Sequence, residues 1–264
     1  MLSIIRPIWN YRGYILGSVK REFQIKYSGS ILGALWNVIQ PLSMILVYTL
    51  IFTQIMKAKL PGVENTFGYS VYLCAGIVTW GLFSEIASRN VNVFIENANL
   101  LKKLSFPRLC LPVIITLSAV LNFSIIFFLF IGFLLLSENV PNNSVLALIP
   151  LLLIQLIFSV GLGIVLGVLN VFFRDVGQFF GVMLQFWFWL TPIVYPIVIL
   201  PEKASELIKY NPMYPLVKSY QDIFVLHLWP DWNTLLYPLS LGLVFCIIGL
   251  YLFRKHSGDM VDEL

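Results

Sequence analysis

Six long stretches of this chain contain no Asp, Glu, Lys or Arg, and they constrain its fold more than any other feature of the sequence. Each is long enough to hold an α-helix that crosses the hydrocarbon core of a bilayer, which takes about 20 apolar residues. The strands of a closed barrel would instead alternate in polarity over about ten residues, and apolar runs such as 125–131 do not alternate. The stretches comprise residues 27–56, 65–84, 109–137, 139–173, 176–201 and 232–253.

The composition points to the same class of protein. Hydrophobic residues make up 59% of the chain and charged residues only 11%, whereas soluble domains carry about 25% charged residues. A soluble fold of this size has too little interior to bury so much apolar surface. We therefore expect an all-α integral membrane protein with one domain over residues 1–264. Its six transmembrane helices are predicted at about 31–56, 68–92, 109–136, 144–172, 176–195 and 233–254.

The distribution of basic residues predicts the orientation of the chain in the membrane. Twelve of the 17 Lys and Arg residues fall on one side of the six predicted spans, in the two terminal segments and the loops between spans 2 and 3 and between spans 4 and 5. Loops rich in Lys and Arg stay in the cytoplasm. Both termini are therefore expected to be cytoplasmic.

Two segments outside the spans are also predicted to be helical. Residues 1–28 interleave basic and apolar residues without the apolar core of a cleavable signal peptide, and their pattern favours an amphipathic helix in the cytoplasmic interface. That helix would be either an anchor or a lever that touches a cytoplasmic partner. Residues 196–231 contain five prolines, yet the runs 197–200 and 223–226 are apolar. Such a mixture suggests short re-entrant helices at the outer side, which must be buried against protein or a cavity.

The residues that catalysis requires are scarce. The histidines are His227 and His256, and the motifs HExxH and GxSxG are absent from the sequence. The three cysteines lie in or beside apolar runs without metal-ligand spacing, so they are interpreted as packing residues. The chain contains no Gly-Lys dipeptide and hence no GxxxxGK[ST] motif for nucleotide phosphates. No catalytic residue and no metal ligand is predicted, and any work the protein does would need energy from another subunit.

A pair of charged residues lies on the inner half of span 2. Glu85 and Arg89 are four residues apart and so share a helix face. Charged residues at membrane depth usually pair or face water. They are interpreted either as a polar gate of a conduit or as a local salt bridge near the helix end.

The segment 96–107 is a short amphipathic stretch ahead of span 3. Its apolar side chains would be exposed in the cytoplasm unless they dock, either on the membrane surface or in a groove of a soluble partner. The residues predicted to couple the chain to such a partner are Asn97, Leu100, Leu101, Lys102, Lys103 and Leu104.

Aromatic residues make up 15% of the chain, and several run through span 5. They either pack against lipid or offer flat faces along which a sugar polymer could slide. The set of motifs distributed along the chain resembles the type-2 ABC exporter permeases, especially the polysaccharide branch that exports O-antigen, capsule or teichoic acid. The motifs are KYSGSILGALW at 26–36 with QPL at 40–42, Trp80, Phe83, Asn97, Leu100, Lys103, FP at 106–107, Pro112, FRDV at 173–176, TPIVY at 191–195 and NPM at 211–213.

This resemblance implies a homodimer in the bacterial cytoplasmic membrane that is bound to two copies of a separate ATPase subunit, which would bind the ATP and Mg²⁺. It implies that the ATPases contact the N-terminal helix and the span 2–3 loop, and that residues 196–231 form an outer gate. It also implies a path for lipid-linked polysaccharide between protomers, lined by spans 1 and 5. The candidate lining residues are Trp36, Tyr48, Phe52, Phe186, Trp187 and Tyr195.

Other functions compete with this interpretation. The same machine could export a drug or a simple lipid. An intramembrane transferase is a different class, but the scarcity of acids and bases in the spans argues against it. A scaffold or an ion channel is a third possibility.

Overall fold

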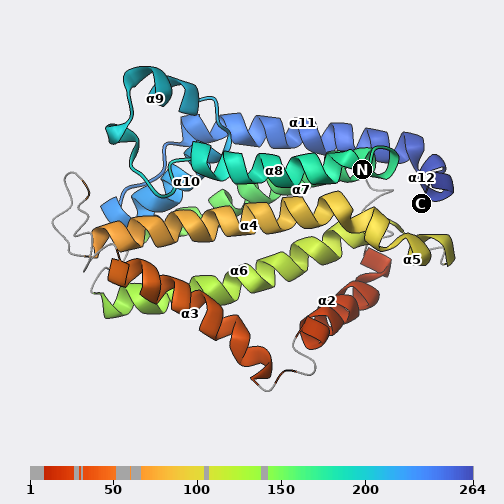
Figure 1. Ribbon diagram of the computed structural model, residues 1–264, viewed down its shortest axis with the longest axis horizontal. Helices are drawn as coiled ribbons and strands as arrows, with labels where there is room; N and C mark the ends of the chain where they lie inside the picture. The colour runs from red at the N-terminus through yellow and green to blue at the C-terminus, as the bar shows by residue number, and fades with distance from the viewer. Residues whose placement is uncertain are drawn as a thin grey trace.

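A long central helix, α4 (Gly68–Glu96), organises a helical bundle (Figure 1). The computed structural model describes residues 9–26, 30, 32–51, 60, 67–103, 107–137 and 142–263, and every element within them is helical. Helices α6 (Cys110–Leu136) and α7 (Leu148–Phe172) pack against α4, and α11 (Trp232–His256) packs along α7. Of the four long apolar helices, α4 is the most buried.

Four of the six predicted spans meet the length and hydropathy that a membrane crossing requires. They are Gly68–Glu96, Cys110–Leu136, Asn143–Phe172 and Trp232–His256, and the third joins η3 (Asn143–Ala147) to α7. Their bounds agree with the predictions within a few residues. These helices confirm an all-α protein with several membrane-length helices.

The helices predicted as spans 1 and 5 are shorter in the described residues. Helix α3 (Trp36–Thr49) follows a short turn, η1 (Gly33–Leu35), and α8 is Asp175–Leu190. They lie on either side of α4, which contacts both of them (Figure 1). The total of six spans therefore stays a prediction.

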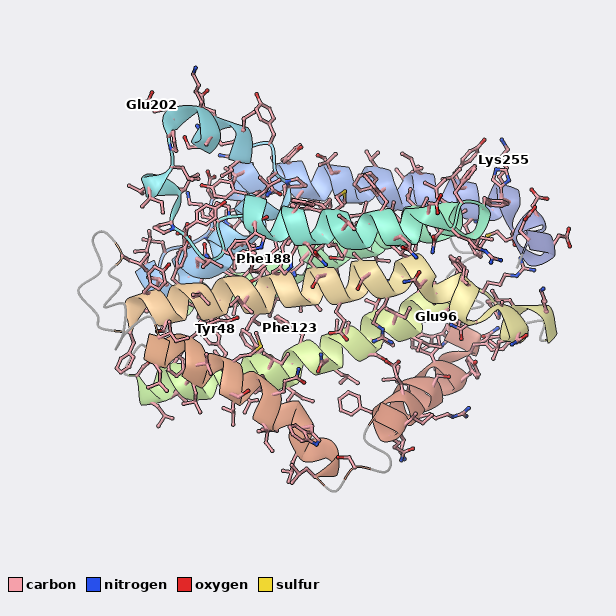
Figure 2. The ribbon with its side chains drawn as sticks, viewed as in Figure 1. Tyr48, Glu96, Phe123, Phe188, Glu202 and Lys255 are labelled. Carbon is pink, nitrogen blue, oxygen red and sulfur yellow. The ribbon has the colours of Figure 1, made fainter. Side chains whose placement is uncertain are left out.

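The two ends of the bundle carry different short helices. Helices α2 (Arg12–Lys26), α5 (Ala98–Lys103) and α12 (Asp259–Glu263) gather at one end, where Figure 2 places Glu96 and Lys255. The other end holds η4 (Ile197–Ile199), α9 (Glu202–Ile208), α10 (Met213–Gln221) and the π-helical turn η5 (Asp222–Leu226), and Figure 2 shows Glu202 there. Short helices thus occupy the region predicted to re-enter the membrane, but their depth in a bilayer stays a prediction.

Glycines allow α7 to approach its neighbours closely. A Cβ atom on Gly167 would lie 2.5 Å from the backbone oxygen of Asn90 on α4. On the opposite side, a Cβ on Gly161 would lie 2.8 Å from the backbone oxygen of Gly242 on α11. Small residues at helix contacts are typical of membrane bundles, where close van der Waals packing drives association. These contacts fix α7 between α4 and α11.

We expect Gly167→Ala to destabilise the folded chain by about 1–3 kcal/mol, because the added methyl group meets backbone that cannot rotate away. Gly132→Ala on α6 is the matched control, since its Cβ has no atom within 4 Å among the described residues. That control should be neutral or slightly stabilising, because alanine favours helix. Thermal unfolding in detergent compares the two variants, and equal midpoints would contradict this account of the packing.

Candidate functional site

An irregular segment follows α8, and side chains from α4 bond to its backbone. The Tyr72 hydroxyl lies 3.1 Å from the carbonyl oxygens of both Pro192 and Tyr195, which share its one proton, and the Tyr69 hydroxyl donates to the Val194 carbonyl oxygen. Non-helical backbone within a membrane protein needs such partners, because lipid offers none. The segment 191–195 is therefore held in a defined shape.

Asn211, just before α10, connects this segment to the end of α8. Its Oδ1 accepts hydrogen bonds from Trp187 Nε1 at 2.7 Å and from the Met213 backbone N–H at 3.0 Å. Its Nδ2 donates to Thr191 Oγ1 at 2.9 Å and to the Leu190 carbonyl at 3.4 Å. One side chain thus uses both its donors and its acceptor to join α8, the irregular segment and α10.

The region after Asn211 is part of the core rather than a loop. Met213, Leu216 and Ile223 are fully buried, and Phe224 packs edge-on against Phe130 of α6 with ring centroids 5.1 Å apart. By contrast, the side chains of α9 are exposed or only half-buried. This end of the bundle therefore combines a buried part, α10 with η5, and a peripheral helix, α9.

A charged network joins three helices nearer the other end. Arg89 of α4 forms ion pairs with Glu22 of α2 and, at 3.4 Å, with Glu85 one turn before it on its own helix. Glu22 Oε2 also accepts from Ser118 Oγ at 2.8 Å, and Glu85 Oε2 from Asn122 Nδ2 at 2.9 Å, both on α6. The predicted local salt bridge exists, but it belongs to a larger network that reaches the N-terminal helix.

Sequence reasoning missed three members of this network: Glu22, Ser118 and Asn122. One signal could have found Glu22, since it is the one acidic residue among residues 1–28. Ser118 and Asn122 are four residues apart in span 3, the spacing that also relates Glu85 to Arg89. Two such pairs on neighbouring spans could have suggested facing polar stripes.

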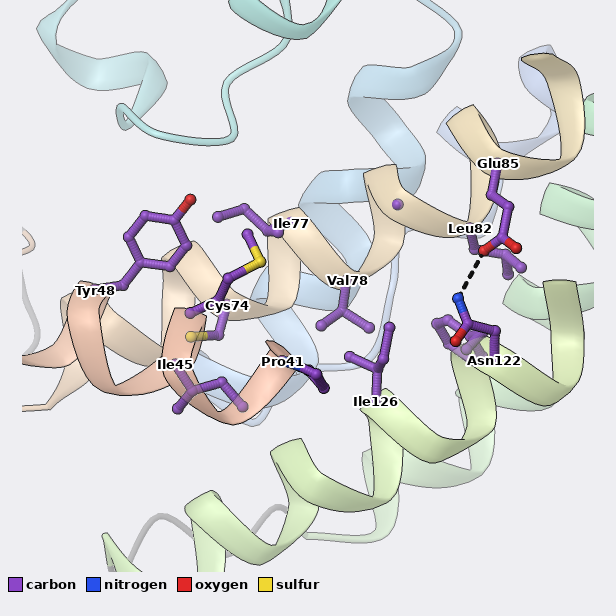
Figure 3. Close-up of a pocket in the computed structure, with 13 residues that line it drawn as sticks. Pro41, Ile45, Tyr48, Cys74, Ile77, Val78, Leu82, Glu85, Asn122 and Ile126 are labelled. Carbon is purple, nitrogen blue, oxygen red and sulfur yellow. Dashed lines mark hydrogen bonds between the residues drawn. The ribbon is translucent and has the colours of Figure 1, made fainter. Parts of the chain in front are cut away.

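An apolar pocket of about 260 Å³ lies between α3, α4 and α6 (Figure 3). Tyr48 and Ile45 line it from α3, and Cys74 and Val78 from α4. At one end it reaches the hydrogen bond between Glu85 and Asn122. Tyr48, predicted to line a conduit, faces this pocket within its own chain.

The other predicted conduit residues do not share one wall within a single chain. Trp36 on α3 and Phe186 on α8 are 45% and 66% exposed, and α4 lies between their helices. The hydroxyl of Tyr195 donates to the Trp189 carbonyl at 2.7 Å. Phe52 lies outside the described residues. Within the described part of the chain, α4 therefore separates the helices that carry Trp36 and Phe186.

Trp187 occupies a different environment from its neighbour Phe186. Its ring lies 5.1 Å from that of Phe83 and 6.1 Å from that of Trp80, both on α4. With its N–H bonded to Asn211, it packs into the core of this chain, whereas Phe186 faces outward. Of these two neighbours, only Phe186 holds the exposed position that a conduit wall requires.

The structure corrects one expectation about the predicted coupling segment. Leu101 was expected to be exposed, but it is 5% exposed and belongs to a buried cluster that includes Phe253 and Met260. Helix α12 supplies Met260 and packs against α5. Folding of the chain thus covers Leu101, and its role in coupling stays a prediction.

The remaining coupling residues are placed as follows. Lys102 is exposed, and Leu100 is half-buried against the same cluster as Leu101. Asn97 is the C-cap residue of α4, and its Nδ2 donates to the Val93 carbonyl oxygen at 2.8 Å. Lys103 is the last residue of α5, and Leu104 lies outside the described residues. Their coupling role stays a prediction.

Comparison with known proteins adds the following matches. The sequence profile of the ABC-2 type transporter family matches residues 15–225. The chain is 28% identical over 266 residues to the O-antigen export system permease protein RfbA of Myxococcus xanthus, with all of both chains covered. It is 32% identical over 246 residues to the protein of that name from Klebsiella pneumoniae, with 92% of each covered. The polysialic acid transport protein KpsM of Escherichia coli is 22% identical over 244 residues, covering 92% of this chain and 93% of that protein.

Proposed function

This chain belongs to the ABC-2 type transporter family, and we propose that it is the transmembrane subunit of an ATP-driven exporter of O-antigen. The cargo would be lipid-linked polysaccharide that crosses the bacterial cytoplasmic membrane. The observation that carries this proposal is the near full-length similarity, at 28–32% identity, to permeases named for O-antigen export. The long apolar helices support a membrane-embedded subunit.

In the proposed assembly, two copies of the chain bind two copies of a separate ATPase. The ATPase binds ATP and Mg²⁺, because this sequence has no phosphate-binding Gly-Lys motif. Each copy would cross the membrane six times with both termini in the cytoplasm. In a dimer with two-fold symmetry, both subunits contribute the same surface patch to the interface. The exposed apolar faces of α3 and α8 are the candidates for that patch.

The conduit would lie along this two-fold interface. A glycan chain is wide and hydrated, so six helices of one subunit would hardly enclose it. The wall would offer flat aromatic faces, with Trp36 and Phe186 in exposed positions and Phe52 predicted beyond the described part of α3. Few charges would line it, since tight binding at one point would stall a moving polymer.

The direct test is complementation in a strain that lacks its own O-antigen permease. Expression of this chain together with its ATPase should restore surface O-antigen, seen as a polysaccharide ladder on a gel. An ATPase variant that binds but does not hydrolyse ATP is the control and should give no ladder. If the intact pair leaves O-antigen inside the cell while both proteins are present in the membrane, the proposal is wrong.

Capsular polysaccharide is the second candidate cargo, because KpsM of Escherichia coli matches over a similar length. The lower identity of 22% ranks it behind O-antigen. The same complementation in a strain without its capsule permease separates the two cargoes.

We expect Lys102→Glu to lower ATP-dependent export about tenfold, within the range of typical coupling energies, while the chain stays folded. Lys102 is exposed on α5 and can reach a cytoplasmic partner. Lys255→Glu, an exposed lysine at the same end of the bundle, is the matched control. The measurement compares ATP hydrolysis and export in proteoliposomes, and equal export by both variants would remove Lys102 from the coupling surface.

A further inference from the structure

Arg89 lies between two carboxylates that come from different helices, Glu22 of α2 and Glu85 of α4. We propose that Arg89 is a two-position switch for the N-terminal helix. In the described arrangement it holds α2 through Glu22. When the partner ATPase draws α2 away, Arg89 passes entirely to Glu85, so that movement of α2 alters the charge contacts inside α4. This inference rests on the proposed function.

Each carboxylate also accepts a hydrogen bond from a neutral side chain of α6, so Glu85 keeps a partner on α6 when α2 leaves, whereas Glu22 gives up Ser118 together with Arg89. Ser118 donates to Glu22 at 2.8 Å and Asn122 donates to Glu85 at 2.9 Å. Leaving a charge unpaired in a protein interior is strongly unfavourable. Here Arg89 keeps Glu85 when α2 leaves, and Glu85 stays anchored to α6 in either position. When α2 leaves, the guanidinium therefore loses one of its two partners and remains paired with the other.

The space around the network allows this movement. A pocket of about 290 Å³ is bordered by the five polar residues of the network together with Phe23. A second pocket of about 480 Å³ lies between α2, α4 and α6, and both Glu22 and Arg89 reach it as well. The side chains of Glu22, Glu85 and Arg89 are 27% to 36% exposed. Groups that open onto cavities can separate and be solvated, unlike groups in a close-packed core.

Helix α2 is also attached lightly. Its buried apolar residues are Ile15 and Val19, which form a small cluster with Cys110 and Ile114 of α6. That cluster is separate from the main core of the bundle. Such sparsely packed elements open at low free energy. Release of the Arg89–Glu22 pair would therefore remove the tie between α2 and α4 and leave α2 held by its contacts with α6.

The test uses the full transporter and measures hydrogen exchange of the α2 backbone together with export. Exchange at residues 12–26 is followed without nucleotide and with ATP bound to a hydrolysis-deficient ATPase. In the unaltered protein, exchange should rise when ATP is bound. Glu22→Gln should raise exchange in both states, whereas Glu85→Gln should lower it in both, because Arg89 is then left with Glu22 alone. Each variant should reduce export by about 2- to 30-fold, the usual range for mutations within coupled networks.

The opposite signs distinguish a switch from a static tie. If both variants raise exchange alike, or if neither changes it, Arg89 is not a switch. Ser124→Ala is the control on α6, since that hydroxyl donates to Val120 of its own helix, and it should change neither measurement. If the unaltered transporter exports but hydrogen exchange in α2 is the same with and without ATP, the switch alone is refuted. If the unaltered transporter does not export at all, the proposed function fails and the switch fails with it.

Discussion

Asn211→Leu is expected to destabilise the chain by about 2–4 kcal/mol and to abolish most of its export. Leucine has a similar size but can neither accept from Trp187 nor donate to Thr191 and the Leu190 carbonyl. Each buried polar group that loses its partner costs about 1–3 kcal/mol. Export should fall more than the loss of stability alone predicts, because the segment 191–195 and α10 would no longer be fixed to the end of α8.

Two comparisons isolate this effect. Asn233→Leu is the matched control. Asn233 is exposed at the start of α11, which lies at the same end of the bundle as α9. Asn211→Asp keeps the acceptor for Trp187 but loses the amide donors. Its stability and its export should therefore lie between those of Asn211→Leu and Asn233→Leu. Thermal unfolding and export in proteoliposomes give the two readouts. Normal export by Asn211→Leu would show that the joined segment has no part in transport.

The second large effect separates a conduit from a lipid-facing surface. Phe128 on α6 and Phe186 on α8 are 72% and 66% exposed in a single chain. An arginine in contact with lipid near the helix centre costs about 2.5–3.5 kcal/mol in insertion. We expect Phe128→Arg to carry that cost. Phe186→Arg should insert and fold nearly normally but block export, because its charge would face a hydrated path.

Membrane insertion and stability of the two variants can be measured side by side, followed by export. The contrast between them is the prediction, since both replace an exposed phenylalanine with arginine. A similar cost at both positions would place the outward face of α8 against lipid and leave the proposed conduit without that wall.

Local sequence was enough to predict the long helices. Uninterrupted apolar stretches, flanked by charged or turn-forming residues, give α4, α6, α7 and α11 within a few residues. This works because an apolar segment in a bilayer must satisfy its own backbone hydrogen bonds, and a helix does so without partners from other segments. The same reasoning placed Glu85 and Arg89 one turn apart on one helix face, as the structure confirms.

Contacts between distant segments could not be predicted in the same way. Glu22 and Arg89 are 67 positions apart, and nothing local marks them as partners. Leu101 looked exposed because its own segment is short and polar at both ends, but α12 from the far end of the chain covers it. Asn211 was identified only as part of the NPM motif at 211–213, with no role assigned to its side chain. Its four hydrogen bonds depend on how α8 ends, which the sequence pattern does not reveal.

The two faces of α8 have different surroundings within the chain. Trp187 is bound on one side by its partners in the core, Phe83 and Asn211, so a change there requires compensating changes elsewhere. The outward face, which includes Phe186, carries no such obligation to the described part of its own chain. Among homologous exporters, substitutions should accumulate on the outward face and leave the core intact. New cargo preferences could thus arise by changes at a few outward positions, with little effect on the folding of the single chain.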